Sequence, residues 1–374
     1  MSPSFDVAVV GLGAMGSAAA YHLARQGRKV LGLDRFTSPH AFGSSHGLTR
    51  IIREAYFEDP CYVPLVQRAY GLWDELQRLA GRELLRITGG LMIGPADGVL
   101  VGGALRSAQE HGLAHELLSA AEVKRRFPAL QPREDMVGVW EPRAGVLFPE
   151  ACIAAHLALA QAHKAALRGD ERVLSWRAEA DGAVRITTER SEYRARQLLL
   201  TAGAWIRSMV PELALPFSVE RQAVCWFAPT ADPELFAPAR CPVSLWETAP
   251  QKFLYGIPDF GDGMKLAVHH EGEEAAPDGL RREVGEAEVA AIRALVQRFV
   301  PGANGPLRSS AVCMYTNTPD QHFWIDRHPQ HPQVLIASPC SGHGFKFAGV
   351  VGEALADWLI TGQPRFDLSR FASR

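Results

Sequence analysis

Several features that mark specialised classes of protein are scarce or missing in this chain of 374 residues. Its 6 cysteines form no CxxC pair and no disulfide framework, so we expect reduced thiols in a cytoplasmic protein. The 39 basic and 41 acidic residues nearly balance, so no overall field attracts nucleic acid or an anionic membrane. No apolar run approaches the roughly 18 residues of a membrane span. The first residues lack the basic and apolar regions of a signal peptide. We therefore expect a cytoplasmic protein with no nucleic-acid or membrane partner.

Lysine is also rare. Only six of the 39 basic residues are lysine, at positions 29, 124, 164, 252, 265 and 346. Codon bias alone can produce such a count, but each lysine in an arginine-rich chain is worth examining. The rest of the composition is ordinary, with 47% hydrophobic and 21% charged residues. A chain of this length exceeds the size of one typical hydrophobic core, so we expect two domains.

The beginning of the chain follows a strand–turn–helix–strand pattern. Residues 5–10 form a short apolar run typical of a buried strand. Residues 17–26 are Ala-rich and predict a helix that ends at Gly27. A second strand is expected over residues 29–33, directly before Asp34.

Three glycines between the first strand and the helix have the spacing G-x-G-x-x-G. Gly11 permits a tight turn, Gly13 lets a pyrophosphate approach the backbone, and Gly16 lets helix and strand pack closely. The helix N-terminus faces the phosphates, and Asp34 can accept a hydrogen bond from a ribose hydroxyl. Because strand, helix and acidic residue are all present, the pattern favours dinucleotide binding over a tight turn without a ligand. It does not separate NAD from FAD.

Strand-and-glycine segments recur later in the chain. Residues 196–200 form a buried-strand run before the sequence TAGAW, and residues 334–337 precede a Gly-rich turn and a helix over about residues 344–359. This recurrence predicts one nucleotide domain assembled from discontinuous pieces. Other segments favour an antiparallel sheet, namely residues 85–93, 137–148, 219–227, 253–257 and 264–269. Two helices, over residues 62–80 and 286–299, are expected to be packing elements.

Seven segments spread over nearly the whole chain resemble one family, the sarcosine oxidases and related N-methyl-amino-acid oxidases, which are flavin amine oxidases of the glutathione-reductase-like class. The segments are GLGAMG at Gly11, SSHGLTRIIREAY at Ser44, WEPRAGVLFPEAC at Trp140, TAGAW at Thr201, KLAVHHEG at Lys265, CMYTNTPDQHFWID at Cys313 and SGHGFKFAGVVGE at Ser341. The last two are highly specific together.

The resemblance implies an α/β fold with two domains. A Rossmann-type FAD-binding domain would comprise residues 1–84, 145–215 and 310–374. An antiparallel-sheet substrate domain would comprise residues 85–144 and 216–309.

The cofactor implied by the resemblance is FAD, attached covalently through Cys313. A cysteine thiolate can add to the electrophilic 8-methyl position of a flavin and shift its electronics. The alternative is that Cys313 is a small buried hydrophobic residue, as most free cysteines are. Cys340 is the rival thiol beside the Gly-rich turn, and we interpret it as a packing residue. The other residues expected to contact FAD are Gly11, Gly13, Ala14, Met15, Gly16, Asp34, Arg35, Ser44, His46, Thr49, Arg50, Gly203, Trp205, Gly342, Gly344, Phe345 and Lys346.

The resemblance also places the substrate. Arg53 and Lys346 match residues that bind the substrate carboxylate, which suits a planar guanidinium with an ammonium as a second charge. The alternative for Arg50 and Arg53 is a solvated helix face. Tyr255 and Tyr315 match aromatic residues of the substrate pocket, with cross-strand packing as their alternative. The segment after Tyr255 is one residue shorter than the family's pattern, which leaves the pocket size open.

Lys265 and His269 are four residues apart in an expected strand, so their side chains point to the same face. The resemblance places His269 near the substrate amine and Lys265 where oxygen is activated. The expected catalytic residues are therefore Lys265, His269, Arg50, Tyr255 and Tyr315. No metal is expected, because adjacent strand residues such as His269 and His270 point oppositely. A second cluster, formed by His322, Asp326, His328 and His331, is expected to be structural.

These observations lead to a functional hypothesis. The chain is expected to be a monomeric FAD oxidase whose partners are a small secondary amino acid and O2. Its leading reaction would convert sarcosine, O2 and H2O to glycine, formaldehyde and H2O2. A second substrate class is a larger N-methyl amino acid or a cyclic imino acid, such as N-methyltryptophan, pipecolate or proline. The sequence also leaves open a flavin dehydrogenase that uses another electron carrier, and a non-enzymatic flavoprotein or NAD-binding module.

Overall fold

The computed structural model describes residues 4–230 and 232–372, and most of their strands lie in two large sheets. The first sheet has the order β10-β11-β12-β1-β2-β9, and β19 and β18 extend it beside β12. Its central strands β19, β12, β1, β2 and β9 are parallel. The bounds are β1 Phe5–Val10, β2 Val30–Leu33, β9 Ala166–Arg168, β10 Val173–Ala178, β11 Val184–Thr188, β12 Glu192–Leu200, β18 Trp324–Arg327 and β19 Val334–Ser338.

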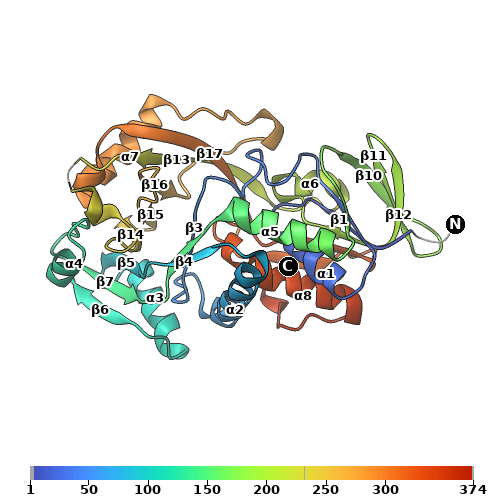
Figure 1. The fold of residues 1–374 in the computed structure, drawn as a ribbon, viewed down its shortest axis with the longest axis horizontal. Coiled ribbons are helices and arrows are strands. Elements are labelled where there is room, and N and C mark those ends of the chain that lie inside the picture. The colour runs from blue at the N-terminus through green and yellow to red at the C-terminus, as the bar shows by residue number, and fades with distance from the viewer. Residues whose placement is uncertain (1–3, 231, 373–374) are drawn as a thin grey trace.

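Three helices pack together beside this sheet (Figure 1). They are α1 (Ala14–Arg25), α5 (Pro149–Ala162) and α8 (Ala348–Thr361), with α2 (Val63–Ala80) against α8 and α5. Small residues allow this close packing: a Cβ placed on Gly352 of α8 would lie 2.6 Å from the Cβ of Ala18 in α1. Strands β2 and β19 are buried along their whole length, and their sequences are accordingly almost continuous apolar runs.

The second sheet has the order β17-β13-β16-β15-β14-β5-β7-β6, and all its neighbours are antiparallel except β14 and β5. The bounds are β5 Gly90–Pro95, β6 Glu116–Ser119, β7 Met136–Glu141, β13 Ser218–Phe227, β14 Val243–Ala249, β15 Lys252–Ile257, β16 Met264–His269 and β17 Leu307–Asn317. Its helices are α3 (Val99–Glu110), α4 (Ala120–Arg126) and α7 (Glu286–Phe299), while the short α6 (Ile206–Met209) follows β12. Figure 1 shows this sheet on the left and the first sheet on the right.

A small third sheet has the order β3-β8-β4, formed by β3 (Arg50–Ile52), β8 (Gly145–Leu147) and β4 (Leu85–Ile87). Two expected strands, over residues 85–93 and 137–148, are each divided between this sheet and the second one. The division has a local cause. Gly89 has a left-handed backbone (φ +71°), and the amides of Thr88 and Gly89 both donate to the carbonyl of Ala144. Each segment therefore turns before it enters the next sheet.

Two helix starts also differ from the sequence expectation. Helix α1 begins at Ala14 rather than at residue 17, since Gly13 is its extended N-cap. The last helix begins at Ala348, because residues Phe345–Phe347 form a separate 3-10 turn. The mixed α/β architecture agrees with the expected fold class. The two-domain division remains a prediction, and its boundary at residue 310 falls inside β17, which pairs with β13 along its length. Within the described residues, no helix is both long and apolar enough to span a membrane.

Candidate active site

One long cavity begins at the carboxyl end of β1 and continues between the first and second sheets. At its first end the glycine turn is tightly packed. Gly11 has φ +92°, and a Cβ there would lie 2.5 Å from the carbonyl oxygen of Thr201. A Cβ on Gly16 would lie 1.8 Å from the carbonyl oxygen of Gly11. Gly13 differs, because its Cβ would meet only Ser45 Oγ at 3.9 Å. The turn therefore leaves open space at Gly13, beside the N-terminus of α1.

Asp34 directly follows β2, beside this turn. Its Oδ2 accepts a hydrogen bond from the amide of Leu12 at 2.6 Å, and its Oδ1 accepts one from the amide of Phe36 at 2.9 Å. Asp34 thus ties the glycine turn to the second strand, and it lines the cavity. Nearby, the Arg35 guanidinium lies 5.7 Å from the ring centroid of Trp205, and both residues also line the cavity.

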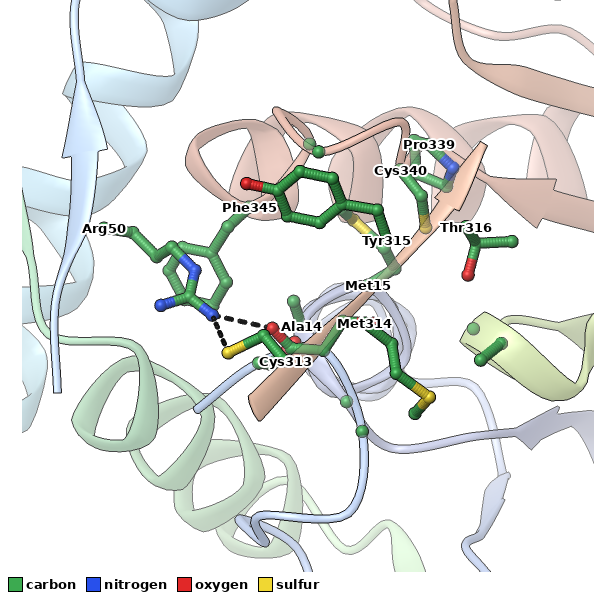
Figure 2. A pocket seen from close by; sticks show the side chains of 18 of the residues that line it. Ala14, Met15, Arg50, Cys313, Met314, Tyr315, Thr316, Pro339, Cys340 and Phe345 are labelled. Atoms are coloured by element: carbon green, nitrogen blue, oxygen red, sulfur yellow. Dashed lines mark hydrogen bonds between the residues drawn. The ribbon is translucent and has the colours of Figure 1, made fainter. Parts of the chain in front are cut away.

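Cys313 and Arg50 meet in the middle of the cavity (Figure 2). Arg50 Nη2 lies 3.6 Å from Cys313 Sγ and donates to the carbonyl of Ser44 at 2.7 Å. Burial alone would raise the pKa of the Cys313 thiol, but the Arg50 guanidinium lowers that pKa to about 6. Burial raises the pKa of Cys340 to about 11. Of these two thiols lining the cavity, Cys313 is therefore the one with thiolate character.

Lys265 lies on β16 and is 1% exposed. Its Nζ donates to the carbonyls of Gly47 and Thr49, at 2.8 and 2.9 Å. It also lies 5.2 Å from the ring centroid of Trp226. Burial, and then the charge of Arg50, lower its pKa to about 7. This lysine therefore joins the second sheet to the loop that carries Arg50.

Arg53 and Lys346 lie at the other end of the cavity. Arg53 makes a bidentate ion pair with Glu58, in which Nη2 donates to Oε1 at 2.8 Å and to Oε2 at 2.7 Å. The Lys346 Nζ donates to the carbonyl of His343 at 2.7 Å and to the hydroxyl of Tyr56 at 3.3 Å. Burial, and then the charge of Arg53, lower the pKa of Lys346 to about 7. Arg53 and Lys346 thus place two cations at one end of the cavity. The Glu58 carboxylate, which is paired with Arg53, also lines the cavity.

Two strands of the second sheet supply an aromatic and imidazole wall. His269 at the end of β16 and Tyr315 on β17 are hydrogen-bonded, with 3.0 Å between Nδ1 and the hydroxyl. Burial, and then the neighbouring His270, lower the pKa of His269 well below its usual value, so this imidazole is neutral. Tyr255 on β15 lines the same wall, and burial raises the pKa of its hydroxyl.

The structure brings nearly all the sequence-predicted site residues to this cavity. Two do not line it: Gly16 packs against the turn, and His46 offers its carbonyl to Cys313 Sγ at 3.7 Å. The arginines at 50 and 53 lie in and beside β3 rather than on a solvated helix face. The remaining predicted residues that line the cavity are Ala14, Met15, Ser44, Thr49, Gly203, Gly342, Gly344 and Phe345.

The cavity has room and donors for a dinucleotide. Besides the open space at Gly13, seven buried side-chain polar atoms have no hydrogen-bond partner in the described part of the chain, and Thr49 Oγ1 and Thr316 Oγ1 are two of them. Thr49 and Thr316 line the cavity, so a bound molecule can satisfy them. These features fit FAD, which the glycine turn and the other residues lining the cavity would hold.

Several residues at the site were missed by sequence reasoning. Glu58 and Tyr56 follow Arg53 closely in REAYFE, but nothing in that spacing shows that they contact the cations. Glu150 accepts hydrogen bonds from the amides of Gly47 and Leu48, at 2.7 and 3.1 Å, and so fixes the loop that Lys265 also holds. The contacts of Glu150 with this loop and of Tyr56 with Lys346 join distant segments, which only the folded chain displays.

Two histidines from the groups considered above as possible metal ligands lie beside carboxylates. His270 lies 3.3 Å from a carboxylate oxygen of Glu220, and His328 lies 2.9 Å from one of Glu212. Among the residues that the structure describes, no three His, Cys, Asp or Glu side chains are grouped to hold a metal ion.

Comparison with known proteins finds relatives that match nearly the whole chain. The chain is 44% identical to the monomeric sarcosine oxidase of Streptomyces avermitilis, over 100% of this chain and 98% of that relative. It is 36% identical to the N-methyl-L-tryptophan oxidase of Salmonella heidelberg, over 98% of each chain.

Solved structures show the same fold at lower sequence identity. NikD, an unusual amino acid oxidase essential for nikkomycin biosynthesis, superposes with a TM-score of 0.85 and 24% identity, covering 100% of this chain and 98% of that one. L-proline dehydrogenase from P. horikoshii has a TM-score of 0.85 and 20% identity, covering 100% and 97%. The model of the FAD dependent oxidoreductase family, DAO, matches residues 6–358. The chain therefore belongs to the FAD dependent oxidoreductase family.

Proposed function

We propose that this protein is an FAD-dependent oxidase of small secondary amino acids, and that sarcosine is its leading substrate. The reaction would convert sarcosine, O2 and H2O to glycine, formaldehyde and H2O2. The 44% identity to a monomeric sarcosine oxidase over the full chain supports this substrate class. The observation that carries the proposal is the pair of buried cations, Arg53 and Lys346, at the end of the cavity away from the glycine turn.

The substrate carboxylate is bound by these two cations. Arg53 offers a planar fork of donors, and the Lys346 ammonium adds a second charge. Both lie in a site where burial strengthens their attraction for an anion. Arg53 already donates hydrogen bonds to the carboxylate of Glu58. The substrate carboxylate therefore either displaces Glu58 from Arg53 or shares Arg53 with it.

The substrate amine lies toward His269 and Tyr315. FAD, when bound, accepts two electrons from the substrate and passes them to oxygen. An amine must lose its proton before the adjacent carbon can give up a hydride, so the site needs an acceptor near the nitrogen. Neutral His269, hydrogen-bonded to the Tyr315 hydroxyl, can accept such a proton or stabilise the free amine. Tyr255 forms the adjoining wall and orients the substrate by contact.

Lys265 provides positive charge for the reduction of oxygen. Its ammonium is fixed by two carbonyls in a buried site, so it is preorganised to stabilise negative charge that develops on oxygen. This feature supports an oxidase rather than a dehydrogenase that passes electrons to another carrier.

Cys313 is the proposed covalent link to FAD. Its lowered pKa and its contact with Arg50 support a thiolate that can add to the flavin. Cys340 lacks this activation, which supports its role as a packing residue.

A larger N-methyl amino acid or a cyclic imino acid is the second candidate substrate, because a 36% identical relative is an N-methyl-L-tryptophan oxidase. Leu245 and Phe253 line the cavity together with Tyr255, and Phe57 packs against Phe253 at a ring-centroid distance of 5.3 Å. These apolar side chains are the ones that a larger substrate side chain would contact. We further propose that the protein is a cytoplasmic monomer, consistent with the name of its monomeric relative.

A peroxidase-coupled screen tests the substrate. Sarcosine, N-methyl amino acids with larger side chains, proline and pipecolate would be compared by kcat/KM for peroxide formation. We expect sarcosine to give the highest value. A higher value for a larger or cyclic substrate would contradict the proposal. Substrate-dependent flavin reduction without peroxide would instead identify a dehydrogenase.

A further inference from the structure

Tyr56 contacts both Arg53 and Lys346, the two cations at the end of the cavity where the substrate carboxylate is proposed to bind (the carboxylate end). Tyr56 itself does not line the cavity. Its side chain is 0% exposed. The Arg53 guanidinium carbon lies 4.3 Å from its ring centroid, which is a close cation–π distance. Its hydroxyl lies 3.3 Å from Lys346 Nζ. A single buried side chain therefore touches Arg53 with its ring face and Lys346 with its oxygen.

The hydroxyl of Tyr56 has a defined direction. His343 Nε2 lies 3.0 Å from the backbone carbonyl of Gln321, which can only accept, so Nε2 carries the hydrogen. Burial lowers the pKa of His343 to about 3, which keeps the ring neutral and leaves Nδ1 as an acceptor. The Tyr56 hydroxyl lies 2.6 Å from that nitrogen and must donate to it. The lone pairs of the Tyr56 oxygen are then free to accept from Lys346.

The hydrogen bonds therefore run in one sense, from Lys346 to Tyr56, from Tyr56 to His343, and from His343 to the Gln321 carbonyl. Lys346 donates its second bond to the carbonyl of His343 itself, at 2.7 Å. An ammonium has three donors, so these two bonds leave one for a ligand in the cavity. Both partners of Lys346 are uncharged oxygens, so they orient its third N–H donor without neutralising the positive charge.

The packing around Tyr56 makes this arrangement rigid. Its ring lies 4.8 Å from that of Tyr62 and 5.3 Å from that of Phe347. Its backbone carbonyl accepts from the hydroxyl of Ser107. Preorganised groups lose little freedom when a ligand binds, so rigidity at this position increases affinity at the carboxylate end.

We propose that Tyr56 is the positioning residue of the carboxylate site, with its hydroxyl directing Lys346 and its ring face supporting Arg53. This inference rests on the proposed function, in which those two cations bind the substrate carboxylate. It adds that the hydroxyl acts through Lys346 alone, since Arg53 contacts the ring.

A double-mutant cycle tests that separation. The holoenzyme would be titrated with methylthioacetate, a carboxylate ligand, and the Kd read from the change in flavin absorbance. Tyr56→Phe should raise the Kd about tenfold, because a hydrogen bond to a charged group is lost. In a Lys346→Met background the same change should alter the Kd by less than about twofold, whereas in an Arg53→Lys background the tenfold effect should persist. A general structural role would give the same effect in both backgrounds and would overturn the inference.

Tyr62 offers a matched control. It is an equally buried tyrosine in the same cluster, but its hydroxyl lies 2.9 Å from His322 Nδ1 and not near Lys346. Tyr62→Phe should leave the Kd within about twofold of wild type. If it raises the Kd as much as Tyr56→Phe does, loss of any hydroxyl from the cluster explains the effect and the inference fails.

The proposed function and this inference can fail separately. If Lys346→Met and Arg53→Lys leave the Kd unchanged, the carboxylate site itself is wrong. If those variants weaken binding and Tyr56→Phe does not, only the role of Tyr56 is wrong. A measurement on the wild-type holoenzyme needs no variant: nitrogen-15 NMR should find His343 with hydrogen on Nε2 and a bare Nδ1. Hydrogen on Nδ1 would overturn the inference, because Tyr56 could not then donate to it.

Discussion

Arg53 and Glu58 form a bidentate ion pair inside the cavity, with both nitrogen–oxygen distances below 3 Å (2.8 and 2.7 Å). Burial alone opposes ionisation of Glu58, but the Arg53 guanidinium holds the pKa of that carboxyl below its usual value. Both residues line the cavity. The chain therefore supplies its own carboxylate to the guanidinium that is proposed to bind the substrate carboxylate.

This pair leads to the first prediction. Glu58→Gln keeps a similar shape but removes the charge that competes with and repels an incoming carboxylate. We expect the Kd of a carboxylate ligand to fall about threefold to tenfold, because Arg53 no longer has a competing carboxylate partner. Calorimetric titration of the holoenzyme measures this Kd. A higher Kd in Glu58→Gln would show that Glu58 orients Arg53 more than it competes.

The second prediction concerns pH. Burial, and then Arg53, lower the pKa of Lys346 to about 7, and only the protonated ammonium attracts a carboxylate. Ligand affinity should therefore be constant below about pH 7 and weaken as pH rises above it. The bound carboxylate raises the pKa of Lys346, so the affinity continues to fall with rising pH until the pH exceeds the pKa of Lys346 in the complex. Lys346→Met should remove the pH dependence, while Lys265→Met, which changes the other lysine of pKa about 7, should retain it.

The third prediction concerns Lys265. Replacement by Met keeps similar bulk and removes the charge that Gly47 and Thr49 hold in place. We expect anaerobic reduction of the flavin by substrate to change modestly and its reoxidation by oxygen to slow by several decades. Stopped-flow mixing separates the two half-reactions. If Lys265→Met is reoxidised at the wild-type rate, the lysine is structural and Arg50 is the next candidate for the positive charge.

The fourth prediction concerns the covalent link. Wild-type protein should retain its flavin absorbance after acid precipitation, and a colourless pellet would exclude a covalent flavin. Cys313→Ser should release the flavin into the supernatant, because serine cannot supply a thiolate. Cys340→Ser is the matched control, since its thiol lies in the same cavity without activation by Arg50. Release by the Cys340 variant instead would contradict the assignment.

The fifth prediction concerns the glycine turn. Gly16→Ala places a methyl group 1.8 Å from the Gly11 carbonyl oxygen, so backbone must move. We expect a loss of about 1–3 kcal/mol in the free energy of unfolding, as for other overpacked sites, together with weaker FAD binding. Gly71→Ala is the control. It lies in helix α2 with nothing within 4 Å of its Cβ, so it should be neutral or stabilising by up to about 1 kcal/mol. Denaturant unfolding measures both.

The sequence by itself determined the elements whose signals are local. The glycine spacing at residues 11, 13 and 16 predicted the turn and the dinucleotide cavity, because the left-handed backbone of Gly11 and the contact of Gly16 with the Gly11 carbonyl are local features. Strand β16 and helix α7 were predicted with their observed bounds, since their hydrophobic periods are unbroken. The same alternation correctly placed Lys265 and His269 on one face, and both line the cavity.

Tertiary structure decided what depends on contacts between distant segments. Nothing near Cys313 in the chain shows that Arg50 lowers its pKa, since 263 positions separate the two residues. In the same way, Tyr56 contacts Lys346 across 290 positions, and Glu150 in helix α5 accepts hydrogen bonds from the amides of Gly47 and Leu48 in a loop. The physical reason is that desolvation and charge–charge energies depend on distance and burial, which are set by packing rather than by order along the chain.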